Sequence, residues 1–204
     1  GVTQVPVHGK AGMTFSTALR SLLRQDPDVL MVGEMRDGET AGIAVQAVMT
    51  GHLVFSTLHT NDAVSAVTRL ADLKVEPYLV AATREGVLAQ RLVRRICPEC
   101  RERYRPDPQA VALVAQQPIG KLTLERGRGC DACRQTGYRG RTGIFEILLA
   151  DDRLRSLILT RADSEGLKGF AVERGMRTIL ADGAAKVLAG ITSAEEVRRV
   201  TQED

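Results

Sequence analysis

Two ionisable side chains, Glu34 and His59, each follow a run of apolar residues that has the length of a β-strand. Residues 29–32 precede the segment that carries Glu34, and residues 53–58 end directly at His59. In open α/β sheets, ligands bind at the carboxyl ends of the strands. A carboxylate and an imidazole at two such ends therefore predict a ligand-binding site.

The segment between the two runs predicts how the strands are arranged. Residues 41, 44, 45 and 48 are apolar at the spacing of one helix face, and Gly51 is suited to end that helix. Two strands joined by a helix run parallel, so Glu34 and His59 share one sheet edge. Neighbouring strands would place their side chains about 5 Å apart, and an intervening strand would double that distance. His52 precedes its strand, roughly 23 Å from His59, so the two histidines cannot ligate one metal.

Four cysteines form a second candidate site, in the pattern CxxC, 29 residues, CxxC. Four thiolates at this spacing are typical of tetrahedral structural Zn²⁺, whose closed site leaves no position for a substrate. An iron–sulfur cluster and a site that has lost its metal remain alternatives. Disulfides are disfavoured, because the chain has no secretory features. The predicted zinc ligands are Cys97, Cys100, Cys130 and Cys133.

The segment around the cysteines, residues 97–141, has too few apolar residues for a core of its own, so we expect the metal to fold it. Its many arginines indicate a solvated surface in preference to a nucleic-acid site. The remainder, residues 142–204, reads as helical. Ser193 and Glu196 have the spacing of a capping box at the start of the last helix. We expect this part to pack or to contact another subunit.

Three further segments have weaker patterns. Val2, Val5 and Val7 suggest an edge strand that is interrupted by Pro6. Thr14 is a candidate N-cap for a helix whose Arg20 and Arg24 are either solvated or in contact with an anion. Residues 77–95 are expected to be helical, because apolar residues recur at four-residue steps over 88, 92 and 96.

Composition narrows the class of protein. The chain has 204 residues, 44% of them hydrophobic, and a net charge of +3, which does not by itself indicate a nucleic-acid or membrane partner. Aromatic residues make up 3%, so stacking platforms for single-stranded nucleic acid are largely excluded. No apolar run reaches the 18 or so residues of a membrane-spanning helix, and no signal peptide is visible. A cytoplasmic protein is the expectation.

Several motifs resemble one family. DPDVLMVGEMRDGETA is similar to the Walker B segment of the bacterial secretion and pilus-assembly ATPases, and TGHLVFSTLHTNDA resembles their histidine box. The four-cysteine module and the C-terminal segment favour the type II secretion ATPases within that family, with the pilus extension ATPases as near relatives. The resemblance extends over nearly the whole chain through RSLLRQDPD, GVLAQRLVRRICPEC, CDACRQTGYRGRTGIFE and GITSAEEV.

The resemblance implies an α/β fold with a partial RecA-like P-loop NTPase core. It implies ATP and Mg²⁺ as ligands and a homo-oligomer, expected to be a hexamer, in the cytoplasm at the periphery of the inner membrane. The partners it implies are inner-membrane platform proteins, through which ATP hydrolysis drives pseudopilus assembly and protein export. Carried over by position, Glu34 matches the Walker B glutamate and His59 the histidine-box residue near the γ-phosphate. Arg36 and Thr57 match supporting polar positions of the nucleotide site.

One departure from the family pattern limits what this chain can do. The Walker A loop, GxxxxGK[ST], is absent: neither Lys10 nor Lys121 has the first glycine before it or Ser/Thr after it. We therefore expect a C-terminal fragment that is inactive alone, with hydrolysis a property of the full-length parent. A non-hydrolytic, zinc-stabilised assembly module is the alternative. The expected divisions are residues 1–96 for the distal part of the ATPase domain, 97–141 for the zinc module and 142–204 for a helical subdomain.

Overall fold

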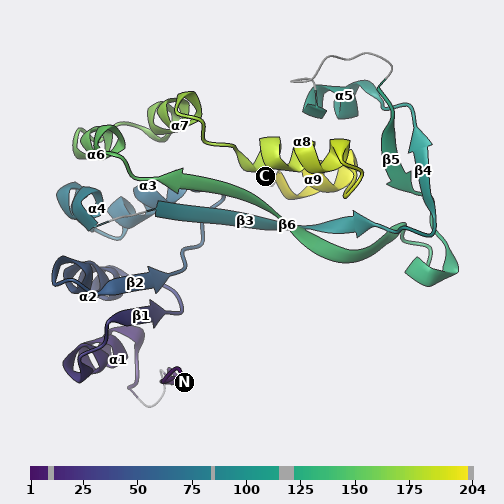
Figure 1. The fold of residues 1–204 in the computed structure, drawn as a ribbon. Helices are drawn as coiled ribbons and strands as arrows, with labels where there is room; N and C mark the ends of the chain where they lie inside the picture. The colour runs from purple at the N-terminus through teal and green to yellow at the C-terminus, as the bar shows by residue number, and fades with distance from the viewer. Residues whose placement is uncertain (9–11, 84–85, 115–121, 202–204) are drawn as a thin grey trace. The chain divides into compact units, whose positions relative to one another are not determined.

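The computed structural model describes residues 1–8, 12–83, 86–114 and 122–201. These residues form two compact units, each assembled from two separate segments of the chain (Figure 1). The first unit comprises Gly1–Val87 and Leu148–Ala171, and the second comprises Leu88–Ile147 and Val172–Asp204. The division of the sequence into residues 1–96, 97–141 and 142–204 stays a prediction.

In the first unit, a strand, a helix and a second strand follow one another as expected. β1 (Val29–Val32) and β2 (Leu53–Ser56) are neighbours and run parallel, joined by α2 (Gly38–Met49). The Asp37 side chain caps α2 by accepting from the Thr40 N–H at 2.8 Å. Gly51, with φ of +100°, then turns the chain toward β2. The predicted parallel pair is confirmed.

One face of this two-stranded sheet is covered by helices. α1 (Phe15–Leu22) begins at Thr14, whose hydroxyl accepts from the Thr17 N–H as predicted, and continues into a short 3₁₀ turn, η2 (Leu23–Gln25). α1 packs against α2. The core below them joins the covered sheet face to the two helices through Leu19, Leu30, Val32, Ile43, Ala44 and Ala47.

The other face of the sheet is exposed, which the continuous apolar runs of residues 29–32 and 53–58 did not predict. Val29 pairs with Leu53 and Met31 pairs with Phe55, so the four side chains share that face. They are between 47% and 73% exposed. Continuous apolar runs are typical of parallel strands that are buried on both faces. Within the part of the chain that the structure describes, only one of the two faces has a covering layer.

Four more helices complete the first unit: α3 (Ser65–Asp72), α4 (Pro77–Thr83), α6 (Asp152–Leu159) and α7 (Ser164–Glu173). α4 packs against α6, α2 and α3. Asp151 caps α6 by accepting from the Leu154 N–H, and Asp163 accepts from the Gly166 N–H in the first turn of α7. The C-terminal part of the sequence thus supplies two helices to the same unit as β1 and β2.

A long two-stranded ribbon replaces the helix expected at residues 77–95. The helix α4 ends at Thr83, and β3 (Gly86–Ile96) pairs with β6 (Tyr138–Leu149), which runs in the opposite direction (Figure 1). The helix prediction holds for Pro77–Thr83 and was wrong from residue 86 onward, because a four-residue step also satisfies the two-residue period of a strand. Leu88 and Leu92 lie on the exposed side, whereas Val93 is buried.

In the second unit, the cysteine segment shares its core with the last two helices. β4 (Arg101–Tyr104) and β5 (Leu124–Gly127) are antiparallel, and α5 (Pro108–Val114) connects to this pair. α8 (Ile179–Leu188) and α9 (Ala194–Thr201) pack against each other and against α5. Among its described residues, the buried aliphatic side chains of the segment form no separate core but join a cluster made of Val93, Ala110, Val114, Leu124, Ile144, Ile179, Val187, Ala194, Val197 and Val200.

The beginning of the chain differs from its prediction. Val2, Val5 and Val7 belong to no strand, and the described pairing there is a single bridge between His8 and Met13. Pro6 has no N–H to donate to a ladder, which works against a regular strand at this position. Among the described residues, no helix has the length and apolar character that crossing a membrane requires.

Candidate functional site

The structure brings Glu34 and His59 into direct contact at one edge of the β1–β2 sheet. Glu34 follows β1 and His59 follows β2, and His59 Nε2 lies 3.2 Å from Glu34 Oε2. This contact follows from the parallel pairing, which places the two strand exits side by side. The predicted meeting of the two side chains is therefore present in the structure.

Arg36 joins this pair, and its guanidinium controls the charge of Glu34. Its Nε lies 2.7 Å from the same carboxylate oxygen, Oε2. The hydrogen bond from Arg36 lowers the pKa of Glu34 below its usual value, the contact with His59 adds to this, and partial desolvation opposes it. Glu34 is thus ionised at neutral pH, with its second oxygen, Oε1, outside both contacts. A carboxylate of this kind can accept hydrogen bonds from water or bind a hard cation.

The three side chains differ in their access to solvent. The Glu34 side chain is 21% exposed, whereas the side chains of Arg36 and His59 are 70% and 81% exposed. The carboxylate is therefore largely surrounded by protein. The guanidinium of Arg36 and the imidazole of His59 lie open to a ligand. Exposed hydrogen-bond donors beside a carboxylate suit an anionic ligand with a bound metal cation, because the donors can contact the anion and the carboxylate can contact the cation.

Thr57, the remaining predicted nucleotide-site residue, braces the two strand exits. Its hydroxyl donates to the Gly33 carbonyl at 2.7 Å, and its own carbonyl accepts from the Met35 N–H at 3.1 Å. These two bonds continue the β1–β2 pairing past the ends of the strands. Thr57 therefore fixes the backbone on either side of Glu34.

The four cysteines converge in the second unit. Their Sγ atoms all lie within 4.8 Å of one another, with separations of 3.9 Å for Cys97–Cys130, 3.9 Å for Cys100–Cys133 and 3.7 Å for Cys130–Cys133. A tetrahedral Zn²⁺ with Zn–S bonds of about 2.3 Å needs sulfur atoms about 3.8 Å apart. Disulfide sulfurs would lie at about 2.05 Å, and all four cysteines are free. The donor set fits zinc.

Backbone N–H groups donate to the Cys133 sulfur atom, and such bonds favour the thiolate that a metal ion binds. Burial raises the pKa of the Cys133 thiol, but hydrogen bonds from the Cys130 and Gly137 N–H groups outweigh it and lower the value to about 6. Burial raises the pKa of the Cys100 thiol to about 12. Four clustered thiolates repel one another, so a divalent metal ion is needed for all four to be deprotonated at neutral pH.

A close backbone contact forms the loop that presents the second cysteine pair. Gly127 ends β5, and a Cβ atom built on it would lie 2.0 Å from the Gly137 carbonyl oxygen. No other residue fits at this crossing. Gly137 also has a φ of +77°, and its carbonyl accepts from the Cys97 N–H at 2.9 Å. The crossing thereby ties the Cys130–Cys133 turn to the first cysteine of the other pair.

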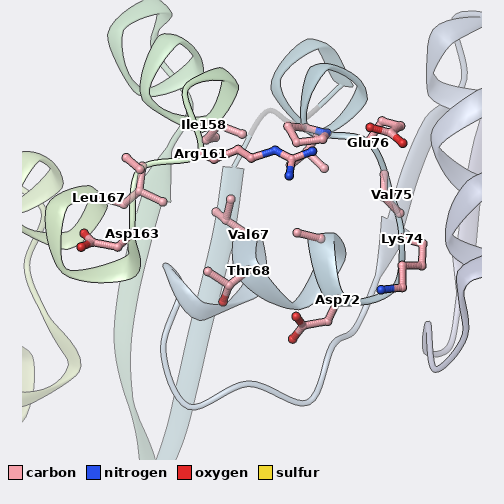
Figure 2. A pocket seen from close by; sticks show the side chains of 14 residues that line it. Val67, Thr68, Asp72, Lys74, Val75, Glu76, Ile158, Arg161, Asp163 and Leu167 are labelled. Atoms are coloured by element: carbon pink, nitrogen blue, oxygen red, sulfur yellow. The ribbon is translucent and has the colours of Figure 1, made fainter.

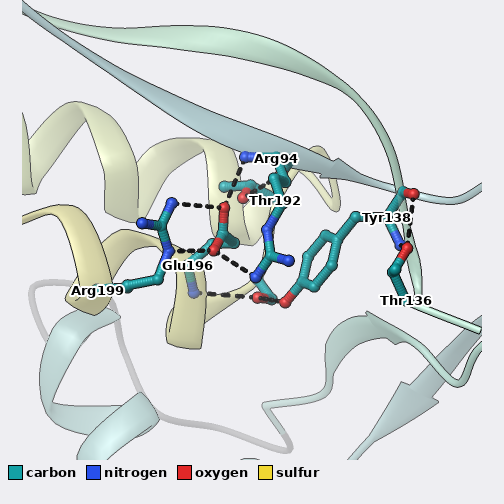
Figure 3. A network of polar contacts seen from close by, with 7 residues as sticks. Arg94, Thr136, Tyr138, Thr192, Glu196 and Arg199 are labelled. Carbon is teal, nitrogen blue, oxygen red and sulfur yellow. Dashed lines mark hydrogen bonds and ion pairs between the residues drawn. The ribbon is translucent and has the colours of Figure 1, made fainter.

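Glu196 is a buried charged residue that the sequence patterns did not single out for its charge. Figure 3 shows its carboxylate between Arg94 of β3 and Arg199 of α9, where it accepts from the Arg94 N–H at 2.8 Å, from Arg94 Nη2 at 2.8 Å and from Arg199 Nε at 2.6 Å. The expected capping box is only half formed. The Ser193 hydroxyl accepts from the Glu196 N–H at 3.2 Å, but the Glu196 carboxylate binds the two arginines instead.

The same network reaches β6 through Arg94. The Arg94 guanidinium lies 4.2 Å from the centre of the Tyr138 ring, and the Tyr138 hydroxyl is 2.6 Å from Ser193 Oγ. Thr192 donates to the Arg94 carbonyl at 2.8 Å. The two strands that flank the cysteine segment are therefore tied to the start of α9.

The predicted surface role of the arginines near the cysteines agrees with their contacts. Arg101 pairs with Glu125 at 3.1 Å, Arg126 with Glu102 at 2.9 Å and Arg139 with Glu99 at 3.0 Å. Arg20 likewise pairs with Glu39 at 2.9 Å. Lys10 and Lys121, which were tested against the Walker A pattern, lie outside the described residues.

A comparison with protein families matches residues 1–199 to the type II/IV secretion system protein family. The type II secretion system protein E of Pseudomonas aeruginosa is 53% identical over all 204 residues, which span 40% of that protein. The type II secretion system ATPase E of Vibrio cholerae is also 53% identical, with 40% of its length covered. The type IV pilus assembly ATPase PilB of Thermus thermophilus is 48% identical over 97% of this chain and 22% of its own length.

Solved structures with the same fold include a pilus retraction motor and an ATPase. The pilus retraction motor PilT with bound ADP superposes with a TM-score of 0.64 at 26% identity, over 93% of this chain and 44% of PilT. The ATPase DotB of Legionella pneumophila gives a TM-score of 0.62 at 22% identity, over 92% and 42% of the two chains. The expected α/β fold of the secretion ATPases is confirmed. The chain spans about two fifths of the curated type II relatives it matches.

Proposed function

Since this chain belongs to the type II/IV secretion system protein family, we propose that it is part of a type II secretion ATPase. In this proposal the parent protein hydrolyses ATP to drive pseudopilus assembly and protein export across the outer membrane. The observation that supports it most directly is the contact between Glu34 and His59 at the carboxyl edge of parallel strands. This edge is where nucleotide-binding α/β sheets hold their ligand.

The chemistry of the site suits phosphoryl transfer, which depends mainly on positioning and on charge stabilisation. Bound Mg²⁺ would supply neutralisation of the phosphate charge. Glu34, ionised and held by Arg36, would orient the water that attacks and bind the cation or its water ligands. His59, with most of its side chain exposed, would donate a hydrogen bond toward the γ-phosphate. Thr57 would keep the backbone around Glu34 in place through its bond to Gly33.

The assembly and its setting belong to the same proposal. We infer a hexameric homo-oligomer that works in the cytoplasm at the periphery of the inner membrane with platform proteins as partners. The four-cysteine site would hold one structural Zn²⁺, because its sulfur separations fit tetrahedral coordination. A pilus extension ATPase is a second candidate, which the 48% identity to PilB supports.

The decisive experiment is Mg-ATP hydrolysis by the full-length parent with Glu34→Ala. Removing the carboxylate that orients water and cation is expected to lower kcat at least ~100-fold. Glu39→Ala is the matched control, because Glu39 is an exposed glutamate of α2 whose ion pair is with Arg20 and not with a residue of the proposed site. Unchanged turnover in Glu34→Ala would refute the role of Glu34.

The 204-residue chain should hydrolyse no ATP when it is assayed alone, because its sequence has no Walker A loop to hold the phosphates. Hydrolysis by the isolated chain that is lost in Glu34→Ala would show a nucleotide site that is complete without that loop. If the full-length parent is inactive as well, the non-hydrolytic assembly module becomes the better description.

A further inference from the structure

The segment that leads from His59 to α3 is held at Asp62 from two directions. Asp62 Oδ1 accepts from the Ser65 N–H at 2.8 Å and from the Ser65 hydroxyl at 2.5 Å, which caps α3. Its other oxygen, Oδ2, accepts from Lys168 Nζ at 2.9 Å. Lys168 belongs to α7, more than 100 residues later in the chain. Asp62, which is anchored from both sides, lies three positions after His59 in the chain.

A cavity beside this ion pair is lined by residues of both α3 and α7. Figure 2 shows a cavity of about 500 Å³ with Val67 and Thr68 of α3 on one side and Leu167 of α7 on another. Leu167 is itself buried at the wall of the cavity. Because side chains do not fill the space there, the Lys168–Asp62 pair is a direct polar connection between α7 and the segment that carries His59.

We propose that Lys168 is a positioning residue for the ATPase site, acting through Asp62 on the segment that holds His59. In this arrangement the placement of α7 sets the placement of the imidazole against Glu34. The inference rests on the proposed function of Glu34 and His59. Under this inference, α7 contributes to hydrolysis as well as to packing. A shift of α7 away from Asp62 would free the segment that carries His59.

The charges and burial of the pair suit such a connection. The Asp62 side chain is 22% exposed and that of Lys168 is 44% exposed, so the pair is partly shielded from solvent. Burial by itself raises the pKa of Asp62, but the bonds from Ser65 and Lys168 outweigh it and lower the pKa below its usual value. An ion pair at this exposure contributes little to the free energy of unfolding, so we expect its loss to leave the stability of the fold nearly unchanged.

The test is steady-state ATP hydrolysis by the full-length parent with Lys168→Met, Lys168→Arg and Asp62→Asn. Lys168→Met is expected to lower kcat about tenfold with less than a twofold change in KM, since a misplaced catalytic group impairs the reaction step. Lys168→Arg should retain most of the activity, because it keeps the cation. The double variant with Asp62→Asn should be no slower than the slower single variant, since both changes break the same contact.

Two controls separate positioning from other effects. Lys74→Met removes a lysine that lines the same cavity and should leave kcat unchanged. Melting temperatures of all variants should agree within a few degrees. A wild-type kcat in Lys168→Met would overturn the positioning role, and so would a loss of kcat that accompanies a lower melting temperature. If Glu34→Ala were slow in the same assay, the proposed function would still stand. If Glu34→Ala itself turned over normally, the proposed function and the inference would both fail.

Discussion

At the scale of single residues, Glu196 shows how a carboxylate is kept ionised without access to solvent. Its side chain is fully buried, yet it accepts hydrogen bonds from the Arg94 backbone and from two guanidinium groups. Burial alone would raise its pKa, but these bonds lower it to about 2. The charge therefore joins β3 to α9 at a point where a neutral side chain would leave donors without an acceptor.

We expect Glu196→Gln to lower the free energy of unfolding by on the order of 2 kcal/mol at pH 7, because a neutral amide pairs more weakly with the two arginines. The folded pKa lies below the unfolded value of about 4.5, so the contribution is full above pH 4.5. It is lost as the pH falls from 4.5 toward 2. Urea unfolding of wild type and variant at several pH values measures this.

Glu195→Gln is the matched control for that prediction, since Glu195 is the exposed neighbour on α9. It should unfold like the wild type at every pH. The difference between wild type and Glu196→Gln should shrink as the pH falls through this range. A gap that stays constant down to pH 2 would show that the ionised form of Glu196 is not what stabilises the protein.

Whether the sequence could predict a contact between site residues depends on how far apart the two partners lie in the chain. Glu34 and His59 follow strands joined by one helix, so their meeting follows from the connection rule for parallel strands. The bond from Lys168 to Asp62 and the bonds from Arg94 to Glu196 join residues about 100 positions apart. No local spacing encodes such a pair. Only the packing of whole elements brings the partners together.

At the scale of elements, the β3–β6 ribbon is where sequence periodicity was insufficient. Leu88, Leu92 and Ile96 satisfy both a helix and a strand, and the choice depends on pairing with β6 some fifty residues later. In the strand, Leu92 and Val93 point to opposite faces. Val93 is fully buried against the core of the second unit, whereas Leu92 is 47% exposed.

The ribbon predicts losses of stability of different size for two adjacent truncations. Val93→Ala should lower the free energy of unfolding by about 2 kcal/mol, because it leaves space in a packed core. Leu92→Ala should cost less than about 1 kcal/mol, because much of its side chain is already in water. Chemical denaturation of the two variants measures both values. A larger loss for Leu92→Ala than for Val93→Ala would contradict the burial of Val93 and the exposure of Leu92 in β3.

The cysteine segment was predicted more completely, because its spacing already contains the chemistry. We expect protein purified without added metal to carry about one zinc atom per chain by elemental analysis. Chelation, or Cys100→Ser, should lower the melting temperature and expose the second unit to protease, since the segment has no core of its own. Ser65→Ala, which changes a hydroxyl in the first unit, should retain the metal. A metal-free protein of equal stability would refute the structural role.

At the scale of the whole molecule, the sequence predicted the class of the fold but not the grouping of its segments. β1, α2 and β2 are consecutive, so local patterns were enough to predict them. The helices α6 and α7 join the first unit and α8 and α9 the second, although all four lie in one stretch that reads simply as helical. Helical periodicity shows which face of a helix is apolar, but it does not show which core that face enters.

The assembly of each unit from two separate stretches limits how the gene can be divided. The chain passes from one unit to the other near residues 87, 147 and 171. A stop codon at residue 172 would remove α8 and α9 from the second unit while leaving every segment of the first. Neither unit can be transplanted into another protein as one uninterrupted stretch. A recombination event that keeps both units intact must therefore exchange the two units together. Any other event would create a new junction inside one of the units.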